Sequence, residues 1–261
     1  MDSNNNISVK TLFANARGQL VGRYGSAAIA SILPGLISLL ATQIAASATG
    51  GQSVGSYLML FFITIIIDLL MGALYFGQSK FFLKIARMKE QPVPSELFSG
   101  FKADFDKSIY VQAAFTAVSV LFSIGVVLIN IGIIPVAESE YMDVYYMLVG
   151  LETIALLIVK LFLGLSFYIL ADHPEYTVPE IFKESLSLMK GNKSKLLLTY
   201  ICAVPFAVLG LLACGIGYIW FSSFLQTVLA NFYLATKKEV PGTPETSDEN
   251  TTSDYSTSDM H

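Results

Sequence analysis

The sequence contains little of what enzymes commonly use at their active sites. Its 261 residues include two histidines, two cysteines and one tryptophan, and only 14% of the residues are charged. His173 and His261 are the only histidines, which leaves no two-histidine metal site and no Ser-His-Asp arrangement in the apolar part of the chain. Cys202 and Cys214 have no neighbours at metal-ligand spacing and imply no disulfide framework. We therefore expect no enzyme activity, no metal and no cofactor.

Lys and Arg are absent from three short connections, at residues 48–56, 135–146 and 213–217. Fifteen of the sixteen Lys and Arg residues lie in four other stretches, at 10–23, 80–107, 183–195 and 237–238. Cytoplasmic loops of membrane proteins collect Lys and Arg, whereas translocated loops lack them. The distribution predicts that both ends of the chain are cytoplasmic.

The apolar content predicts a membrane protein. Apolar residues make up 54% of the chain, and the mean hydropathy is +0.60. Charged residues make up 14% of this chain, whereas they make up roughly 25% of soluble domains. A bilayer requires about 20 apolar residues per helix, and helices satisfy their own backbone groups in lipid. We predict an all-α polytopic membrane protein with six transmembrane helices, at 26–47, 56–78, 109–133, 147–170, 196–213 and 217–235.

The first predicted span has two local features. Pro34 frees a backbone carbonyl within the helix and permits a kink. The span ends in Ala46-Ser47-Ala48, which has the form of a signal-peptidase site. Its apolar stretch is about as long as a full membrane span, which favours retention as an anchor over cleavage.

Three segments of the chain repeat a common pattern. Phe13, Phe98 and Phe182 are 85 and 84 residues apart, and each is followed by basic residues and a pair of apolar spans. We predict three parallel repeats, each a short amphipathic helix followed by a transmembrane hairpin. The repeats cover about 9–78, 94–170 and 178–236.

The short helices are candidate interfacial helices. In the last copy an apolar stripe at helical spacing ends at Met189, and such a helix can lie at the headgroup boundary. The alternative is that the short helices pack against the mouth of the bundle. Gly22 and Gly191, each nine residues after the Phe, are expected to form the bend into the spanning helix. The middle copy has Lys107 at this position and should turn differently.

Three ionisable residues lie inside the predicted spans: Asp68, Glu152 and Lys160. Asp68 and Glu152 are one repeat length apart and occupy matching places. A charge in hydrocarbon costs roughly 2.5–3.5 kcal/mol on insertion scales, so such residues usually face the bundle interior and pair. We expect an ion pair between Asp68 and Lys160. The pair either fixes helix register or belongs to a polar, proton-linked pathway.

The last 25 residues differ from the rest of the chain. Residues 237–261 hold two Lys and six acidic residues among Thr, Ser and Asn, with one aromatic residue, Tyr255. This composition predicts a disordered acidic cytoplasmic tail after a transmembrane domain at 1–236. Because the tail accounts for the whole net charge of −4, the transmembrane domain is neutral on balance, and we expect no nucleic-acid partner.

Several motifs resemble a family of bacterial membrane proteins. They are the stretch ARGQLVGRYG at 16–25, Asp172-His173-Pro174, Glu184-Ser185, MKGNK at 189–193 and Asn231-Phe232-Tyr233. In this order they resemble Gram-positive bacterial integral membrane proteins grouped as domain of unknown function 975. The resemblance covers nearly the whole chain except the tail. It implies a bacterial plasma membrane and brings no known activity, cofactor or catalytic residue.

Two classes of function remain open. The first is a non-catalytic membrane protein that binds lipid headgroups, or a membrane-protein partner or second copy of itself, through its cytoplasmic juxtamembrane helices. A similarity in layout only, to membrane domains fused to some glycerophosphodiesterases, keeps lipid-linked roles open. The alternative is a small permease or transporter that uses Asp68, Glu152 and Lys160.

Overall fold

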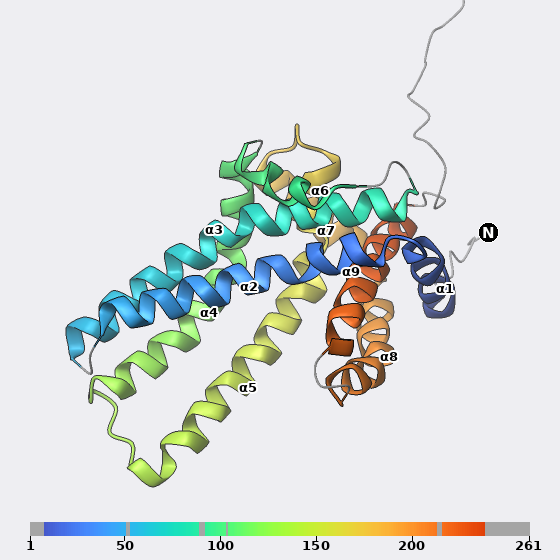
Figure 1. Cartoon of the computed structure of the whole chain (residues 1–261). Helices are drawn as coiled ribbons and strands as arrows, with labels where there is room; N and C mark the ends of the chain where they lie inside the picture. The colour runs from blue at the N-terminus through green and yellow to red at the C-terminus, as the bar shows by residue number, and fades with distance from the viewer. Residues whose placement is uncertain (1–7, 51–52, 89–91, 103, 213–215, 238–261) are drawn as a thin grey trace, which may run out of the picture.

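The computed structural model describes residues 8–50, 53–88, 92–102, 104–212 and 216–237. Every regular element in these residues is helical (Figure 1). The helices are α1 (Val9–Leu20), α2 (Tyr24–Thr49), α3 (Val54–Ala86), η1 (Pro94–Phe101), α4 (Phe105–Asn130), α5 (Glu138–Leu163), α6 (Ser166–Asp172), α7 (Val178–Met189), α8 (Lys193–Leu212) and α9 (Ile216–Thr236). The all-α prediction is confirmed. The predicted acidic tail lies outside the described residues from position 238 onward.

Five helical segments are long and apolar enough to cross a membrane: Tyr24–Thr49, Val54–Ala86, Phe105–Asn130, Glu138–Asp172, which comprises α5 and α6, and Lys193–Leu212. They correspond to the first five predicted spans. The sixth predicted span forms α9, which is not among them. Gln226 and Asn231 lower the hydropathy of α9, and Asn231 is fully buried.

A short helix precedes two long helices three times along the chain: α1 before α2 and α3, η1 before α4 and α5, and α7 before α8 and α9. This order agrees with the expected one, while the relation of the three units as sequence repeats remains a prediction. Gly22 and Gly191 separate the short helix from the long one in the first and last units, with φ of 75° and 83°. Nothing lies within 4 Å of a Cβ added at either position, so the left-handed backbone, not space, favours glycine there.

The middle unit turns differently, as its missing glycine predicted. Its short helix, η1, is a 3₁₀-helix of eight residues, and Asp104 takes the left-handed conformation with φ 55° before α4 begins. η1 packs on α3 through two glycines. A Cβ on Gly77 would overlap the carbonyl of Leu97, and a Cβ on Gly100 would overlap that of Ala73. The two backbones therefore approach more closely than any side chain allows.

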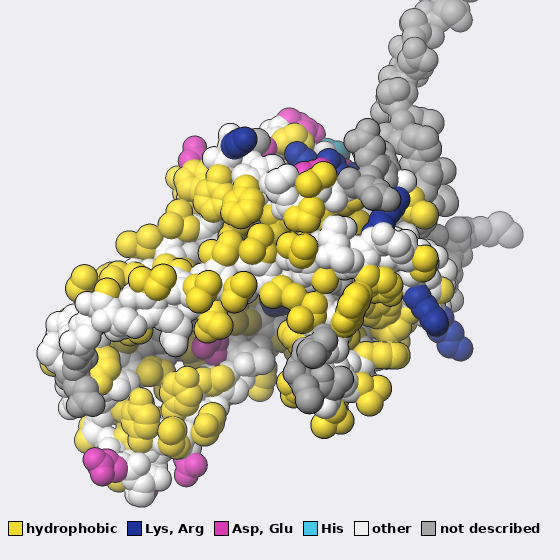
Figure 2. Space-filling view, in the orientation of Figure 1, with side chains coloured by type: hydrophobic (Ala, Val, Ile, Leu, Met, Phe, Trp, Pro, Cys, Tyr) yellow, Lys and Arg dark blue, Asp and Glu magenta, His cyan; other side chains and the backbone are white. Residues whose placement is uncertain are grey.

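The buried core lies at one end of the molecule. It joins the short helices to α6 and to the carboxyl-terminal halves of α3 and α9; its largest fully buried side chains include Phe81, Phe82, Leu97, Ile181, Phe232 and Tyr233. We call this the basic end, because it carries the exposed cations described below. The opposite, far end holds the turn between α4 and α5, and α5 has no buried residue at all. Figure 2 shows apolar side chains over much of the elongated surface between the two ends.

The fourth predicted span, 147–170, is not one continuous helix. α5 ends at Leu163, and α6 begins at Ser166 after a break at Gly164 and Leu165. The hydroxyl of Ser185 in α7 donates a hydrogen bond to the carbonyl of Phe162 at 3.0 Å. A side chain that inserts into the helical ladder in this way is a recognised cause of a sharp bend.

Candidate functional site

The three intramembrane charges do not form the expected pair. Asp68 lies half-buried on α3, and Glu152 lies partly buried on α5. Lys160 is exposed on α5, and within the described residues no ion pair joins it to Asp68. The prediction of an Asp68–Lys160 pair is therefore wrong in this structure. The reason is that α5 packs against α4, α7 and α8 rather than along α3.

Glu152 instead lines a cavity of 450 Å³ between α3, α4 and α5. Tyr57, Thr64, Ser123 and Asn130 contribute polar groups to a mostly apolar wall. Pockets of this size accommodate small organic molecules. The cavity is the place where the structure brings one of the predicted intramembrane residues together with other polar side chains.

Polar side chains on one side of α9 meet polar side chains of α1 and α2. Gln19 and Asn231 exchange two hydrogen bonds, with Gln19 Nε2 donating to Asn231 Oδ1 at 3.1 Å and Asn231 Nδ2 donating to Gln19 Oε1 at 2.6 Å. Further along α9, Ser223 contacts Ser31 of α2 at 2.9 Å. These contacts fix how α9 crosses the molecule, since an unpaired buried amide costs about 1–3 kcal/mol.

Gln78 on α3 satisfies the carbonyl that Pro34 frees. Proline has no N–H, so the Ala30 carbonyl, four residues earlier, lacks its helical donor. Gln78 Nε2 donates to this carbonyl at 2.9 Å, and Gln226 Nε2 of α9 donates in turn to Gln78 Oε1 at 3.4 Å. The freed carbonyl predicted from Pro34 is thus the first member of a chain of hydrogen bonds from α2 through α3 to α9.

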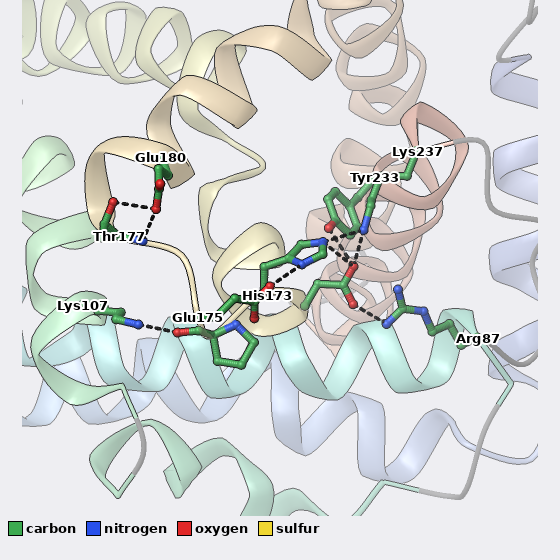
Figure 3. Close-up of polar contacts among 10 residues, drawn as sticks. Arg87, Lys107, His173, Glu175, Thr177, Glu180, Tyr233 and Lys237 are labelled. Carbon is green, nitrogen blue, oxygen red and sulfur yellow. Dashed lines mark hydrogen bonds and ion pairs between the residues drawn. The ribbon is translucent and has the colours of Figure 1, made fainter. Parts of the chain in front are cut away.

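The strongest cluster of charges joins the ends of three helices at the basic end (Figure 3). The carboxylate of Asp172, at the end of α6, accepts hydrogen bonds from Arg87 at 2.7 Å, Lys237 at 2.7 Å and the Tyr233 hydroxyl at 2.9 Å. The side chain of Asp172 is only 5% exposed. Arg87 immediately follows α3, Tyr233 lies in the last turn of α9 and Lys237 immediately follows it. One buried carboxylate therefore ties together the final helices of all three units.

His173 extends this cluster toward the loop before α7. One ring nitrogen lies 2.9 Å from Lys237 Nζ and the other 2.9 Å from Glu175, while the ring stacks on Tyr176 with centroids 4.6 Å apart. Figure 3 shows Lys107 reaching the same loop from the other side, where it donates to the Pro174 carbonyl. Every one of these polar groups has a protein partner, which suits a structural junction.

The loop ends in a capping box at the start of α7. The Glu180 carboxylate accepts hydrogen bonds from the Thr177 backbone N–H at 2.8 Å and from its hydroxyl at 2.7 Å. These bonds favour the charged form, so they lower the pKa of the Glu180 carboxyl below its ordinary value. Such a box stabilises the first turn of a helix, and α7 begins at Val178, where the third predicted repeat begins.

The short helices bury one face in the core. Leu12, Leu97 and Ile181, the residues immediately before the three repeat phenylalanines, are all less than 5% exposed. Met189 is fully buried. Phe13 and Phe182 are partly buried and pack on the core, whereas Phe98 is 44% exposed. The buried stripe packs these helices against the core at the basic end, and their contact with lipid headgroups stays a prediction.

The opposite faces of the short helices carry cations. Among the described residues, the exposed Lys and Arg side chains other than Lys160 all belong to the short helices or to the residues that cap them. They are Lys10, Arg17, Lys102, Lys183 and Lys190. At the far end the exposed charges include Glu138, Glu140 and Asp143, all acidic.

A family profile described as "Protein of unknown function (DUF975)" matches residues 4–239. The chain belongs to the DUF975 family. No curated protein and no solved structure matches the chain. The match covers every described residue, from α1 to Lys237, and confirms the family that the sequence motifs resemble.

In this DUF975 protein the Asp172 cluster could have been found from the repeat spacing. Arg87 and Asp172 are 85 residues apart, the same separation as Phe13 and Phe98. In the predicted repeats they would occupy matching positions at the ends of the first two units. In the sequence, Asp172, His173, Gln19 and Asn231 stood out only as members of the family motifs, and nothing indicated their partners or singled out Gln78. Within the described residues no group of three His, Cys, Asp or Glu side chains could hold a metal ion.

Proposed function

We propose that this DUF975 protein is a non-catalytic, multi-pass protein of the bacterial plasma membrane that binds anionic lipid headgroups at its basic end. In this proposal α9 is the sixth span, the three units are parallel repeats, and both chain ends are cytoplasmic. The Lys and Arg distribution supports this orientation, because cytoplasmic segments collect these residues. The five candidate spans support the membrane location.

The observation that carries the proposal is the placement of the five exposed cations. All three units contribute to them, and each cation lies on or beside a short helix whose other face is buried in the core. Basic residues next to a membrane attract anionic headgroups by about 1 kcal/mol each. Exposed acids at this end include Glu175 and Glu180, which already accept hydrogen bonds from His173 and Thr177. A protein partner would need a matching acidic surface, whereas anionic lipid is present wherever the helices meet the bilayer.

The test is the lipid selectivity of the reconstituted chain. Spin-labelled phosphatidylglycerol and phosphatidylcholine are compared for the fraction immobilised at the protein surface. We expect the immobilised fraction of phosphatidylglycerol to exceed that of phosphatidylcholine severalfold. Each cation contributes about 1 kcal/mol, and the measurement averages over lipids at several sites around the protein. The preference should be lost in a variant that replaces the five exposed cations with Gln, at Lys10, Arg17, Lys102, Lys183 and Lys190.

The matched control neutralises exposed charges of the other sign at the far end. Glu138→Gln with Glu140→Gln should leave the selectivity unchanged, because these residues lie at the opposite end from the proposed contacts. A wild type that immobilises both lipids equally would contradict the proposal.

A second function, a proton-linked permease, is favoured by the cavity that Glu152 lines. If this function holds, proteoliposomes with an imposed pH gradient should show proton flux to an internal pH dye. Glu152→Gln should abolish the flux while the protein remains folded, and Glu138→Gln should not. Flux that Glu152→Gln leaves unchanged, or a wild type without flux, would exclude a role for this carboxylate in proton movement.

A further inference from the structure

Two adjoining hollows lie on the side of the molecule formed by α1, α8 and α9. The first has a volume of 650 Å³ and the second 660 Å³, and Phe13 and Phe206 line both. The rings of these residues are 6.1 Å apart, and Phe13 also contacts Phe224 at 5.2 Å. The shared residues make the hollows two parts of one groove, which we call the α1/α8 groove.

The groove changes from polar to apolar along its length. Its first part begins among Lys10, Lys195 and Ser8 and continues over Leu198. Its second part is lined mainly by apolar and aromatic side chains of α8 and α9, including Leu209 and Trp220. One end therefore carries the ammonium groups of Lys10 and Lys195, and the remainder is lined by apolar side chains together with the guanidinium of Arg17.

The location of the groove restricts what can fill it. α8 is one of the helices long and apolar enough to span a membrane, and Phe206 and Leu209 on its surface are 51% and 64% exposed. Apolar side chains exposed on a spanning helix face the hydrocarbon of the bilayer. An occupant must then be soluble in the membrane along most of the groove and anionic at the end with the two lysines.

We propose that the α1/α8 groove binds one anionic glycerophospholipid. Its phosphate lies between Lys10 and Lys195, and an acyl chain follows the groove past Phe206 to Trp220. Lysine binds phosphate as a mobile point charge, which suits a headgroup at a bilayer surface. Arg17 lines the second part of the groove, on the same exposed face of α1 as Lys10. This site rests on the proposed function, because it gives the anionic lipid one defined position.

Trp220 makes the site directly measurable. It is the sole tryptophan of the chain, it lines the groove and it is 47% exposed. Bromine atoms on an acyl chain quench tryptophan fluorescence only at contact distance. The full chain is therefore reconstituted in phosphatidylcholine with a low mole fraction of either brominated phosphatidylglycerol or brominated phosphatidylcholine.

We expect brominated phosphatidylglycerol to quench Trp220 at about thirtyfold lower mole fraction than brominated phosphatidylcholine, because each of the two lysine contacts contributes about 1 kcal/mol. Lys10→Gln with Lys195→Gln should reduce the quenching by phosphatidylglycerol to the level of phosphatidylcholine. Lys10→Arg with Lys195→Arg keeps both charges and should retain most of the difference. The control, Glu138→Gln with Glu140→Gln, removes two charges at the far end that do not line the groove and should leave the quenching unchanged.

The outcomes separate this site from the general function. Equal quenching by the two lipids in the wild type overturns the site, while the spin-label preference for phosphatidylglycerol can still stand. A difference that survives Lys10→Gln with Lys195→Gln in a protein with unchanged thermal stability also overturns it. If the wild type shows no spin-label preference, but phosphatidylglycerol still quenches Trp220 more strongly than phosphatidylcholine, anionic lipid binding is limited to this single groove.

Discussion

Replacing Asp172 with Asn should lower the free energy of unfolding by about 3 kcal/mol, because breaking a buried ion pair leaves charge uncompensated in a poorly solvated place. The carboxylate accepts bonds from Arg87, Lys237 and Tyr233, and its side chain is 5% exposed. Asparagine keeps the shape but brings no charge to the two cations. The change is measured by denaturation in mixed micelles, with Trp220 fluorescence as the signal.

Glu175→Gln is the matched control for Asp172→Asn. Glu175 belongs to the same network through His173, but its side chain is 63% exposed. Exposed ion pairs contribute about 0–1 kcal/mol, so the control should unfold almost like the wild type. Equal stabilities of the two variants would show that the Asp172 cluster does not hold the ends of α3, α6 and α9 together.

Gly77→Ala should also destabilise the protein, by about 3 kcal/mol, because overpacking at a site without room costs 1–3 kcal/mol or more. The added Cβ would overlap the carbonyl of Leu97, which is a backbone atom and cannot move unless η1 moves with it. Gly100→Ala meets the backbone of Ala73 from the other side of the same contact and should have a similar effect. Thermal unfolding of the purified variants in detergent measures both changes.

The control for these substitutions is Gly25→Ala in α2. Gly25 is exposed in the first turn of the helix, and nothing lies within 4 Å of an added Cβ. Alanine is favoured over glycine in a helix by about 0.5–1 kcal/mol, so this variant should be as stable as the wild type or more stable. If Gly77→Ala behaves like Gly25→Ala, the close packing of η1 on α3 is not required for stability.

The order and extent of the helices followed closely from local patterns. The first predicted span, 26–47, corresponds to α2 at Tyr24–Thr49, and the fifth, 196–213, to α8 at Lys193–Leu212. Long apolar stretches bounded by charged or turn residues are sufficient for such predictions. The bends at Gly22 and Gly191 were also predictable, because the left-handed backbone there favours glycine whatever the helices around it do.

The partners of the polar residues did not follow from the sequence. The expected Asp68–Lys160 pair is absent from the described residues, since α5 packs away from α3. The pairing of Gln19 with Asn231 spans 212 positions of the chain. The amides of α9 lowered its hydropathy, but no periodicity indicated that they would meet amides of α1 and α3.

The sequence by itself therefore determined the membrane class, the helices and the positions of the bends, because hydropathy, charge distribution and glycine conformation act over short stretches of chain. Only the tertiary structure decided that Asp172 forms ion pairs with both Arg87 and Lys237. It also decided that the backbones of η1 and α3 are in direct contact, and that Lys10 and Lys195 lie at one end of a mainly apolar groove. Those contacts depend on the angles and depths at which helices cross. Crossing geometry is set by packing among residues far apart in the chain, which local patterns do not encode.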